Sequence, residues 1–487
     1  MPLPNRIFPT LLGLLTATVA IVSGQTAAAT AAKPNILFLL SDDHSYPYLG
    51  AYNNPDVRTP HLDQLAREGV RMDRAFVTAP SCVPSRASLM SGRSAIAARM
   101  ARFSAPLPGD VVTLPDVLRH EAGYYTGVAG RYHHLDGPER KFADRNPIMW
   151  QMIGEHDLRT FERRFDYAQE PGEMEDFGGK LEAFLDQVPE DQPWFFWLNF
   201  SDPHHVWTMQ GPEGLPDPSK LTVPPYLPDL PGVRGDLARY IAEIEHLDHD
   251  VGEVLEVLHA RGLSENTVVV FMGDNGMAFP HGKGALHDPG IAVPMVLRWP
   301  GVVEPGQSTE ALISGEDLAP TLIDLAGATP PAEMSGVSFQ KLLRGQPFPE
   351  RRQYVFAERG PHGGDGGMNP GTSAATFDLA RCVRTDRYKL IYNCTPHRRV
   401  APIDSAGQPS WREIVAAHAA GTLAEPFVKA YFTTPRETYE LYDLHDDPAE
   451  LHNRAGDPAY QEIEHKLKVV LAEKMLLDSD FLPLPVR

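Results

Sequence analysis

The chain of 487 residues contains 44 Lys and Arg against 64 Asp and Glu, for a formal net charge of −20, and 42% of its residues are hydrophobic. This is the composition of an ordinary soluble globular protein, and it excludes a disordered chain. The length exceeds what one core usually organises, so we expect two domains, or one large domain with an appendage. The acidic balance argues against a broad phosphate-binding surface, and we expect no nucleic acid partner.

The N-terminal segment has the layout of a secretory signal peptide. Arg6 precedes an apolar run over residues 11–22, and small residues follow over 27–32. The apolar run is shorter than the ~20 residues that a membrane-spanning helix needs. We therefore expect residues 1–32 to be removed, no membrane span in the mature chain, and a protein that is periplasmic, secreted or lumenal.

Three apolar runs, at 35–40, 194–198 and 267–272, have the continuous hydrophobicity of strands that are buried on both faces. Each run ends in a cluster of polar residues. Amphipathic patterns at 59–69 and 236–259 predict helices between these strands. The alternation predicts an α/β fold with a large, mostly parallel sheet sandwiched by helices. Because ligands bind beyond the carboxyl ends of the strands in such sheets, we expect the polar clusters to form the functional site.

The end of the chain has a different pattern, which predicts a smaller C-terminal α+β domain. Strand-like residues at 381–392 and 439–442 indicate an antiparallel sheet, and a helical pattern covers 460–476. A turn-rich stretch separates this part from the rest of the chain. We therefore expect a main domain over 33–372 and a C-terminal domain over 373–487.

The three cysteines, Cys82, Cys382 and Cys394, are too few for a disulfide framework in a chain of this length. Cys382 and Cys394 flank a predicted hairpin. A turn centred near Asp386 would set Cys382 opposite about Leu390 rather than opposite Cys394. We therefore expect these two thiols to be unpaired.

Four oxygen-bearing side chains follow two of the predicted strands. Asp42 and Asp43 come after the first strand, and Asp274 and Asn275 come after the third. Carboxylate and amide oxygens suit Ca²⁺ or Mg²⁺ rather than zinc, which prefers His and Cys. Each pair alone more commonly caps a turn, so the metal interpretation depends on independent support.

That support comes from residues 82–86, which read Cys-Val-Pro-Ser-Arg. A lone cysteine in an exported protein is usually a small buried side chain. Here Pro84 and the helix-like run after it place Cys82 at a helix N-terminus, where backbone N–H groups favour an anion. The position suits a nucleophile that faces a sulfate or a phosphate.

Together these motifs resemble those of the formylglycine-dependent type I sulfatases of the alkaline phosphatase superfamily. The C-x-P-S-R motif of that family is matched in full at residues 82–86. The resemblance implies an alkaline phosphatase-like fold. It also implies that a formylglycine-generating or sulfatase-maturating enzyme oxidises Cys82 to Cα-formylglycine during biosynthesis, and that the hydrate of this aldehyde is the catalytic nucleophile.

The resemblance further implies which residues act on the sulfate and which bind the metal. Arg86 holds the formylglycine hydrate, and His133 deprotonates its second hydroxyl. His204 and Lys283 lie at the leaving group, and Lys283 also contacts the sulfate. Arg131 stands where the family usually has lysine, so the charge is kept while the planar guanidinium alters the sulfate contact. The residues implied to hold one Ca²⁺, with Mg²⁺ as the alternative, are Asp42, Asp43, Cys82, Asp274 and Asn275.

Within this family, the segments 51–54 with 59–63, 223–228 continuing to 234–238, and 274–276 with 279–280 resemble the heparan N-sulfatases, also called sulfamidases. The first hypothesis is therefore an N-sulfoglucosamine sulfohydrolase that acts on heparan- or heparin-type sulfated saccharides. An O-sulfatase acting on another sulfated polysaccharide is an alternative, because loops decide specificity in this fold. A phosphoesterase of the same superfamily and a non-catalytic glycan-binding relative are further alternatives, and Arg131 is the one assigned position that hints at the latter.

Overall fold

The computed structural model of the chain describes residues 33–100, 105–137, 147–169, 176–362, 378–400 and 402–481. Residues 34–487 belong to one compact unit. The expected signal peptide, 1–32, and the expected domain boundary between residues 372 and 373 lie outside the described ranges. Every helix in those ranges is too short or too polar to cross a membrane.

Strand β1 (Asn35–Ser41) lies inside an eight-stranded sheet, and all of its residues are buried. It pairs in parallel with β6 (Trp194–Asn199) on one side and with β7 (Thr267–Gly273) on the other. These are the three strands that the apolar runs predict, each one residue longer than expected. Leu40 lies opposite Asn199 in β6, and Ser41 lies opposite Gly273 in β7. The carboxyl ends of the three strands therefore reach the same edge of the sheet.

The other strands of this part of the chain are β2 (Val70–Met72), β3 (Ala75–Phe76), β4 (Tyr125–Gly130), β5 (Tyr167–Gln169), β8 (Met295–Arg298), β9 (Gln307–Thr309) and β10 (Ile313–Ser314). The large sheet has the order β5-β4-β6-β1-β7-β8-β2-β9, and β3 pairs with β10 separately. Strand β8 is antiparallel to both of its neighbours, whereas all the other pairs of the large sheet are parallel. The prediction of a large, mostly parallel sheet is confirmed.

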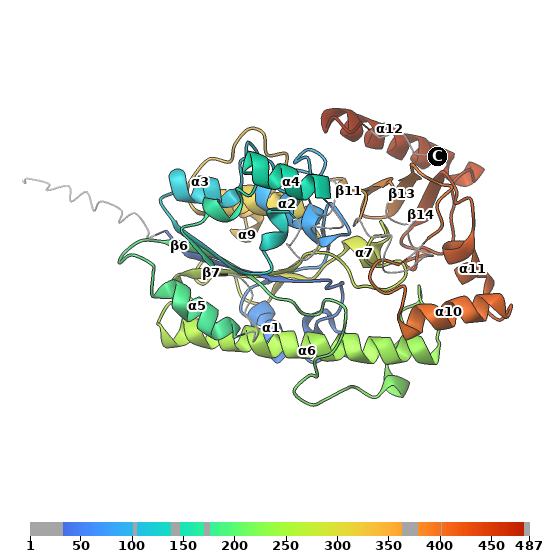
Figure 1. The fold of residues 1–487 in the computed structure, drawn as a ribbon, viewed down its shortest axis with the longest axis horizontal. Coiled ribbons are helices and arrows are strands. Elements are labelled where there is room, and N and C mark those ends of the chain that lie inside the picture. Colours follow the sequence, from blue (N-terminus) through green and yellow to red (C-terminus); the bar gives the residue numbers. More distant parts are fainter. Residues whose placement is uncertain are drawn as a thin grey trace, which may run out of the picture. The chain divides into compact units, whose positions relative to one another are not determined.

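Helices cover both faces of the large sheet (Figure 1). One face carries α2 (Cys82–Ser91), α3 (Leu114–His120), α4 (Pro147–His156), α8 (Leu318–Leu325) and α9 (Gln340–Leu343), and the other carries α1 (Pro60–Arg67), α5 (Phe177–Leu185) and α6 (Pro231–Ala260). Because side chains alternate along a strand, β1 contributes to two cores. Phe38 and Leu40 pack in the core with α2, α3 and α8, while Leu37 and Leu39 pack in the core with α1, α5 and α6. The predicted helical sandwich is confirmed.

The long helix α6 begins earlier than the predicted range of 236–259. Leu230 is extended and Pro231 occupies the first helical turn, where its fixed φ favours the helix and its missing N–H has no intrahelical partner to lose. Val233 is buried and continues the apolar face toward the N-terminus. The short helix α7 (Asp288–Ile291) lies between β7 and β8 in the chain.

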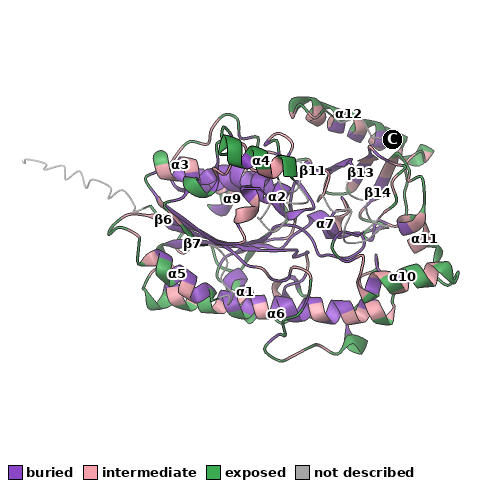
Figure 2. Cartoon of the chain, viewed as in Figure 1, coloured by how far each residue is buried: buried purple, intermediate pink, exposed green. Residues whose placement is uncertain are grey.

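The C-terminal part contains an antiparallel sheet, as predicted, and this sheet has four strands. Its strands are β11 (Val355–Arg359), β12 (Ala380–Arg384), β13 (Tyr388–Asn393) and β14 (Tyr439–Asp443), in that order. Helix α12 (Gln461–Leu477) packs on this sheet, and α10 (Pro409–Ala419) and α11 (Glu425–Phe432) lie nearer to the end of α6 (Figure 1). Figure 2 shows the strands buried, with exposed residues gathered on the outward sides of α4, α10 and α12.

The hairpin between β12 and β13 differs by one residue from the expected register. Cys382 lies opposite Ile391, and Leu390 lies opposite Val383. The Thr385 N–H donates to the Tyr388 carbonyl at 2.8 Å, so the turn is centred between residues 386 and 387 rather than on 386. The expectation that Cys382 and Cys394 are unpaired is confirmed.

Candidate active site

The polar residues that follow β1, β6 and β7 meet at one edge of the sheet. The Asp42 N–H donates to the Asp202 carbonyl at 3.1 Å, which ties the loop after β1 to the loop after β6. The Asp274 N–H donates to the Ser41 carbonyl at 3.0 Å, and the Asp43 N–H donates to Asp274 Oδ1 at 3.0 Å. These bonds hold Asp42, Asp43 and Asp274 close together, and all three carboxylates are fully buried.

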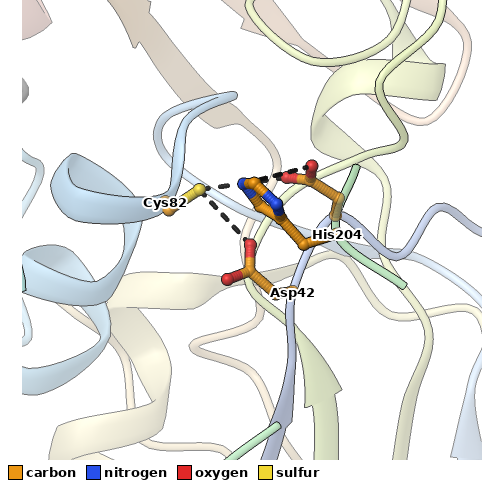
Figure 3. A group of neighbouring side chains, drawn as sticks. Asp42, Cys82 and His204 are labelled. Carbon is orange, nitrogen blue, oxygen red and sulfur yellow. Dashed lines mark hydrogen bonds and ion pairs between the residues drawn. The ribbon is translucent and has the colours of Figure 1, made fainter. Parts of the chain in front are cut away.

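Helix α2 places Cys82 against this acidic edge. Pro84 fits in its first turn, where N–H groups have no intrahelical acceptor. Figure 3 shows the Cys82 side chain beside Asp42 and His204, and its Sγ lies 3.3 Å from Asp42 Oδ1 and 3.9 Å from Asp43 Oδ1. Burial, together with the charge of Asp42, raises the pKa of the Cys82 thiol well above its ordinary value. The unmodified side chain is therefore a neutral thiol and a poor nucleophile at neutral pH.

Arg86 is completely buried and connects four parts of the site. Its Nε donates to Asp274 Oδ2 at 2.9 Å, and its Nη2 donates to Asp42 Oδ2 at 3.1 Å. Its Nη1 donates to the Arg131 carbonyl and to Asn199 Oδ1, both at 2.8 Å. Only a planar guanidinium presents donors in this fan-shaped arrangement. Arg86 therefore holds α2, β1, β4, β6 and β7 in one fixed geometry.

Asn275 and Lys283 both contact Asp43. Asn275 Nδ2 donates to Asp43 Oδ1 at 2.8 Å, and Lys283 Nζ lies 2.8 Å from Oδ1 and 3.0 Å from Oδ2 of the same carboxylate. Asn275 Oδ1, in contrast, is buried and has no hydrogen-bond partner among the described residues. A buried amide oxygen without a partner is costly, and a cation could satisfy it.

The electrostatics of the carboxylates also fit a bound cation. Burial raises the pKa of Asp43 to about 8 and that of Asp274 to about 6. A divalent cation would hold both groups in the ionised form. Oxygen donors from Asp42, Asp43, Asp274 and Asn275 are the set that Ca²⁺ or Mg²⁺ prefers. The residues present therefore fit a hard divalent cation.

Arg131 and His204 lie at the accessible side of the cluster. Arg131 Nη1 is 3.0 Å from Asp42 Oδ2, and His204 Nε2 is 3.9 Å from Asp43 Oδ2. Burial lowers the pKa of His204 to about 3, so its ring is neutral. His133 lies two residues after Arg131, with its ring edge-on to that of His134 at a centroid distance of 4.5 Å.

The structure thus brings nine of the ten expected site residues into direct contact with one another. The tenth expected residue, His133, lies two residues after Arg131 in the chain. The nine residues are Asp42, Asp43, Cys82, Arg86, Arg131, His204, Asp274, Asn275 and Lys283.

Two site residues had not been expected. Asn199 is the last residue of β6 and accepts a hydrogen bond from Arg86, and its place in the polar cluster after a predicted strand was a usable signal. Asp404 lies 2.7 Å from Lys283 Nζ and 3.8 Å from His204 Nε2. Asp404 follows no predicted strand and belongs to no motif, so the sequence offered no signal for it.

An ion pair anchors the loop that carries His204. His246 Nδ1, on α6, lies 2.8 Å from Asp202 Oδ2, and Asp250 and Glu243 also face the imidazole. The hydrogen bond with Asp202 raises the pKa of His246 from 6.5 to about 9, although partial burial opposes it. His246 is therefore a cation at neutral pH and stabilises the loop through Asp202.

This pair predicts a pH-dependent contribution to stability. A histidine whose pKa is higher in the folded state contributes stability that is fully present below pH 6.5 and is lost as the pH rises through about 9. Across this window we expect the wild-type protein to lose on the order of 1 kcal/mol more unfolding free energy than His246→Gln. Urea denaturation at several pH values measures the difference.

The matched control for this prediction is His445→Gln, since His445 is exposed and pairs with Asp446 at the surface. Its pH profile should follow that of the wild type. Parallel profiles for the wild type and His246→Gln would contradict the predicted contribution.

Sequence comparisons show which known proteins the chain resembles. The chain matches the model of the sulfatase family over residues 34–328 and that of the N-sulphoglucosamine sulphohydrolase C-terminal region over residues 279–410. An ulvan-active sulfatase of Formosa agariphila is 31% identical over 453 residues, covering 88% of this chain and 72% of that protein. Human N-sulphoglucosamine sulphohydrolase is 28% identical over 494 residues, covering 91% of this chain and 90% of that protein.

Solved structures share the fold. A protein in complex with its substrate D-glucosamine-2-N,6-O-disulfate has a TM-score of 0.66 at 18% identity, covering 93% of this chain and 99% of that chain. A phosphonate monoester hydrolase of Silicibacter pomeroyi has a TM-score of 0.67 at 21% identity, covering 91% and 96%. At these identities the likeness concerns the fold alone, whereas the family model covers more than half of the chain. The chain therefore belongs to the sulfatase family.

Proposed function

We propose that this protein removes sulfate from a sulfated glycan by means of a formylglycine nucleophile at position 82. The observation that carries the proposal is the position of Cys82, at the N-terminus of α2 and in contact with a buried carboxylate cluster. Three cations lie close enough to Cys82 to interact with it electrostatically, namely Arg86, Arg131 and Lys283. This concentration of positive charge suits a sulfate group.

Oxidation of Cys82 to Cα-formylglycine by the maturing enzyme would supply an aldehyde that binds water to form a hydrate. One hydroxyl of the hydrate attacks sulfur and displaces the sugar oxygen or nitrogen. Deprotonation of the other hydroxyl then expels sulfate and restores the aldehyde. The thiol is a poor substitute, because its raised pKa keeps it protonated. Cys82 is 1% exposed, so the maturing enzyme has to reach it before the chain folds. We propose that this occurs during export, with residues 1–32 as the signal peptide and the periplasm, a lumen or the exterior as the destination.

Different residues of the chain then bind the sulfate and transfer protons. Arg131 and Lys283 offer positive charge to the sulfate oxygens, while Arg86 orients the modified side chain. Asp404 and Asp43 raise the pKa of the Lys283 ammonium above its ordinary value against the opposing effect of burial, and His204 is neutral. Lys283 Nζ is therefore the better donor of a proton to the leaving oxygen or nitrogen. His133 is proposed to accept the proton of the second hydroxyl.

We assign one divalent cation, Ca²⁺ with Mg²⁺ as the alternative, to Asp42, Asp43, Asp274 and Asn275, together with the modified side chain at position 82. When bound, it would add positive charge at the sulfate and polarise one of its oxygens. The unpartnered Asn275 Oδ1 and the three neighbouring carboxylates support this assignment.

We expect Ca²⁺ to raise the unfolding temperature of the wild-type protein. We expect the Asp274→Asn variant to show only a small part of that increase. A ligand at about 100 times its Kd stabilises the fold by about 2.7 kcal/mol. The asparagine keeps the shape of the side chain but removes a charged ligand from the site. The measurement is the unfolding temperature of chelator-treated protein before and after addition of Ca²⁺. Asp217→Asn, at an exposed pair with Ser219, is the control, and equal stabilisation of all three proteins would contradict the assignment.

The substrate proposal is an N-sulfoglucosamine of a heparan- or heparin-type saccharide, with an O-sulfate of another polysaccharide as the alternative. The similarity to human N-sulphoglucosamine sulphohydrolase supports the first, and the similarity to an ulvan-active sulfatase supports the second. Sulfate release from N-sulfo-glucosamine, 6-O-sulfo-N-acetylglucosamine and an ulvan oligosaccharide tests both, with conversion of Cys82 verified by peptide mass. Release from none of the three, with release of phosphate from a phosphomonoester, would overturn the proposed function.

A further inference from the structure

We propose that Asp404 is a specificity-determining residue, which accepts a hydrogen bond from a free hydroxyl group on the sugar carbon next to the one that bears the scissile sulfate. The inference rests on the proposed function and deepens it. It concerns a part of the site that comes from the C-terminal segment of the chain, far in sequence from the strand ends that supply the other residues.

Local packing forces the Asp404 side chain into the site. Ile403 packs against Gly284, the residue after Lys283, so closely that a Cβ at Gly284 would collide with it. The Ser405 N–H donates to the Ile403 carbonyl at 2.7 Å, which closes a three-residue turn around Asp404. Asp404 has a φ of +63°, a left-handed conformation that few non-glycine residues adopt. Such conformations persist where the surroundings impose them, and they cluster at functional sites.

A second contact fixes the far end of the same loop. Gln408 hydrogen-bonds to His205, the neighbour of His204 in the chain, and Ser405 is completely buried. The loop over residues 402–408 is therefore attached both to the Lys283 segment and to the His204 segment. This places the Asp404 carboxylate between the two groups that we assign to the leaving-group side of the reaction.

The accessibility of the site shows which groups a bound sugar meets. Cys82 and Asp42 are closed off from solvent, but the side chains of Arg131, His204 and Asp404 remain 20%, 22% and 24% accessible. Arg131 is a cation and suits the sulfate. Asp404 is an anion, because the charge of Lys283 outweighs burial and lowers the pKa of the Asp404 carboxyl. Its carboxylate repels sulfate oxygens and accepts hydrogen bonds, so the sugar group that it meets is a donor.

A hydroxyl next to the sulfated carbon is the donor that this position recognises. The scissile group is bound on the Arg131 and Lys283 side, and Asp404 lies beside Lys283 and His204, where the bond to the leaving group breaks. The ring atoms next to that bond are the nearest part of the sugar. The same carboxylate would exclude a sugar that carries a second sulfate at that neighbouring position, because two anions would be forced together.

The test compares two substrates in the matured, Ca²⁺-loaded enzyme. One is the monosulfated sugar that the wild type turns over, and the other is its deoxy analogue, which lacks the neighbouring hydroxyl. Asp404→Gly removes the carboxylate and tolerates the left-handed backbone. For the hydroxyl-bearing sugar we expect kcat/KM to fall by about 10- to 100-fold, the range for a hydrogen bond to a charged group. For the deoxy analogue the same variant should fall much less.

The comparison separates recognition from a structural role. If Asp404 acted only by holding Lys283, both substrates would lose the same factor, and this result would overturn the inference. Asp404→Asn keeps the shape of the side chain and also tolerates positive φ. This variant should therefore recover part of the lost kcat/KM on the hydroxyl-bearing sugar. It also provides the test if the glycine variant is unstable. Asp191→Gly is the matched control, because Asp191 is exposed and has a φ of +60°. A wild-type enzyme that releases sulfate from no monosulfated sugar would overturn the proposed function, and this result is distinct from an equal loss on the two substrates.

Discussion

Cys82→Ala is expected to lower the rate of sulfate release by about 10⁴- to 10⁶-fold, the range seen when a nucleophile is removed from an enzyme that forms a covalent intermediate. The loss is nearly total because the variant removes the side chain that the maturing enzyme converts into the nucleophile. Substrate binding should change little, since the cations that hold the sulfate remain. The measurement combines sulfate release with the affinity for an unreactive substrate analogue.

The matched control is Cys394→Ser, at a half-buried cysteine of the C-terminal sheet region. This variant should retain full activity. The pair also tests the role of maturation, because wild-type protein produced without a maturing enzyme should be as inactive as Cys82→Ala. Sulfate release from unconverted protein at the rate of the converted protein would contradict the proposed nucleophile.

Arg86→Ala is expected to lower the free energy of unfolding by about 3–5 kcal/mol, because it leaves buried carboxylates without their partner. Arg86, Asp42 and Asp274 are all fully buried, with N–O distances of 3.1 and 2.9 Å. The variant also loses the bonds to Asn199 and to the Arg131 carbonyl, so activity should fall with stability. Urea denaturation and sulfate release measure the two effects.

Arg86→Lys separates charge from geometry in this prediction. Lysine restores one positive charge but cannot present donors in the four directions that the guanidinium fills, so we expect stability to recover in part and activity to remain low. Arg163→Ala is the control, since the two bonds between Arg163 and Asp157 lie at the exposed surface and solvent-exposed pairs of this kind contribute little to stability. An Arg86→Ala variant as stable as this control would show that the network is not a major source of stability.

The strand ends are the part of the site that the sequence predicted best. A strand buried on both faces is a continuous apolar run, and its end is visible as the first polar residues, so Asp42, Asp43, Asp274 and Asn275 could be located directly. Cys82 was located by Pro84 and the helical run after it. The antiparallel hairpin was predicted with a register that was wrong by one residue, because a single residue in the turn decides the pairing.

The sequence by itself determined the sheet, the helices on both faces, the polar strand ends and the motif that identifies the family, because each of these depends on residues that are close together in the chain. Only the tertiary structure decided that Arg86 bonds to four separate segments and that Asp404 enters between Lys283 and His204. It also decided the protonation of these groups, since burial and neighbouring charges shift each pKa. Such contacts join residues far apart in the chain, and only the packing of the completed fold brings them together.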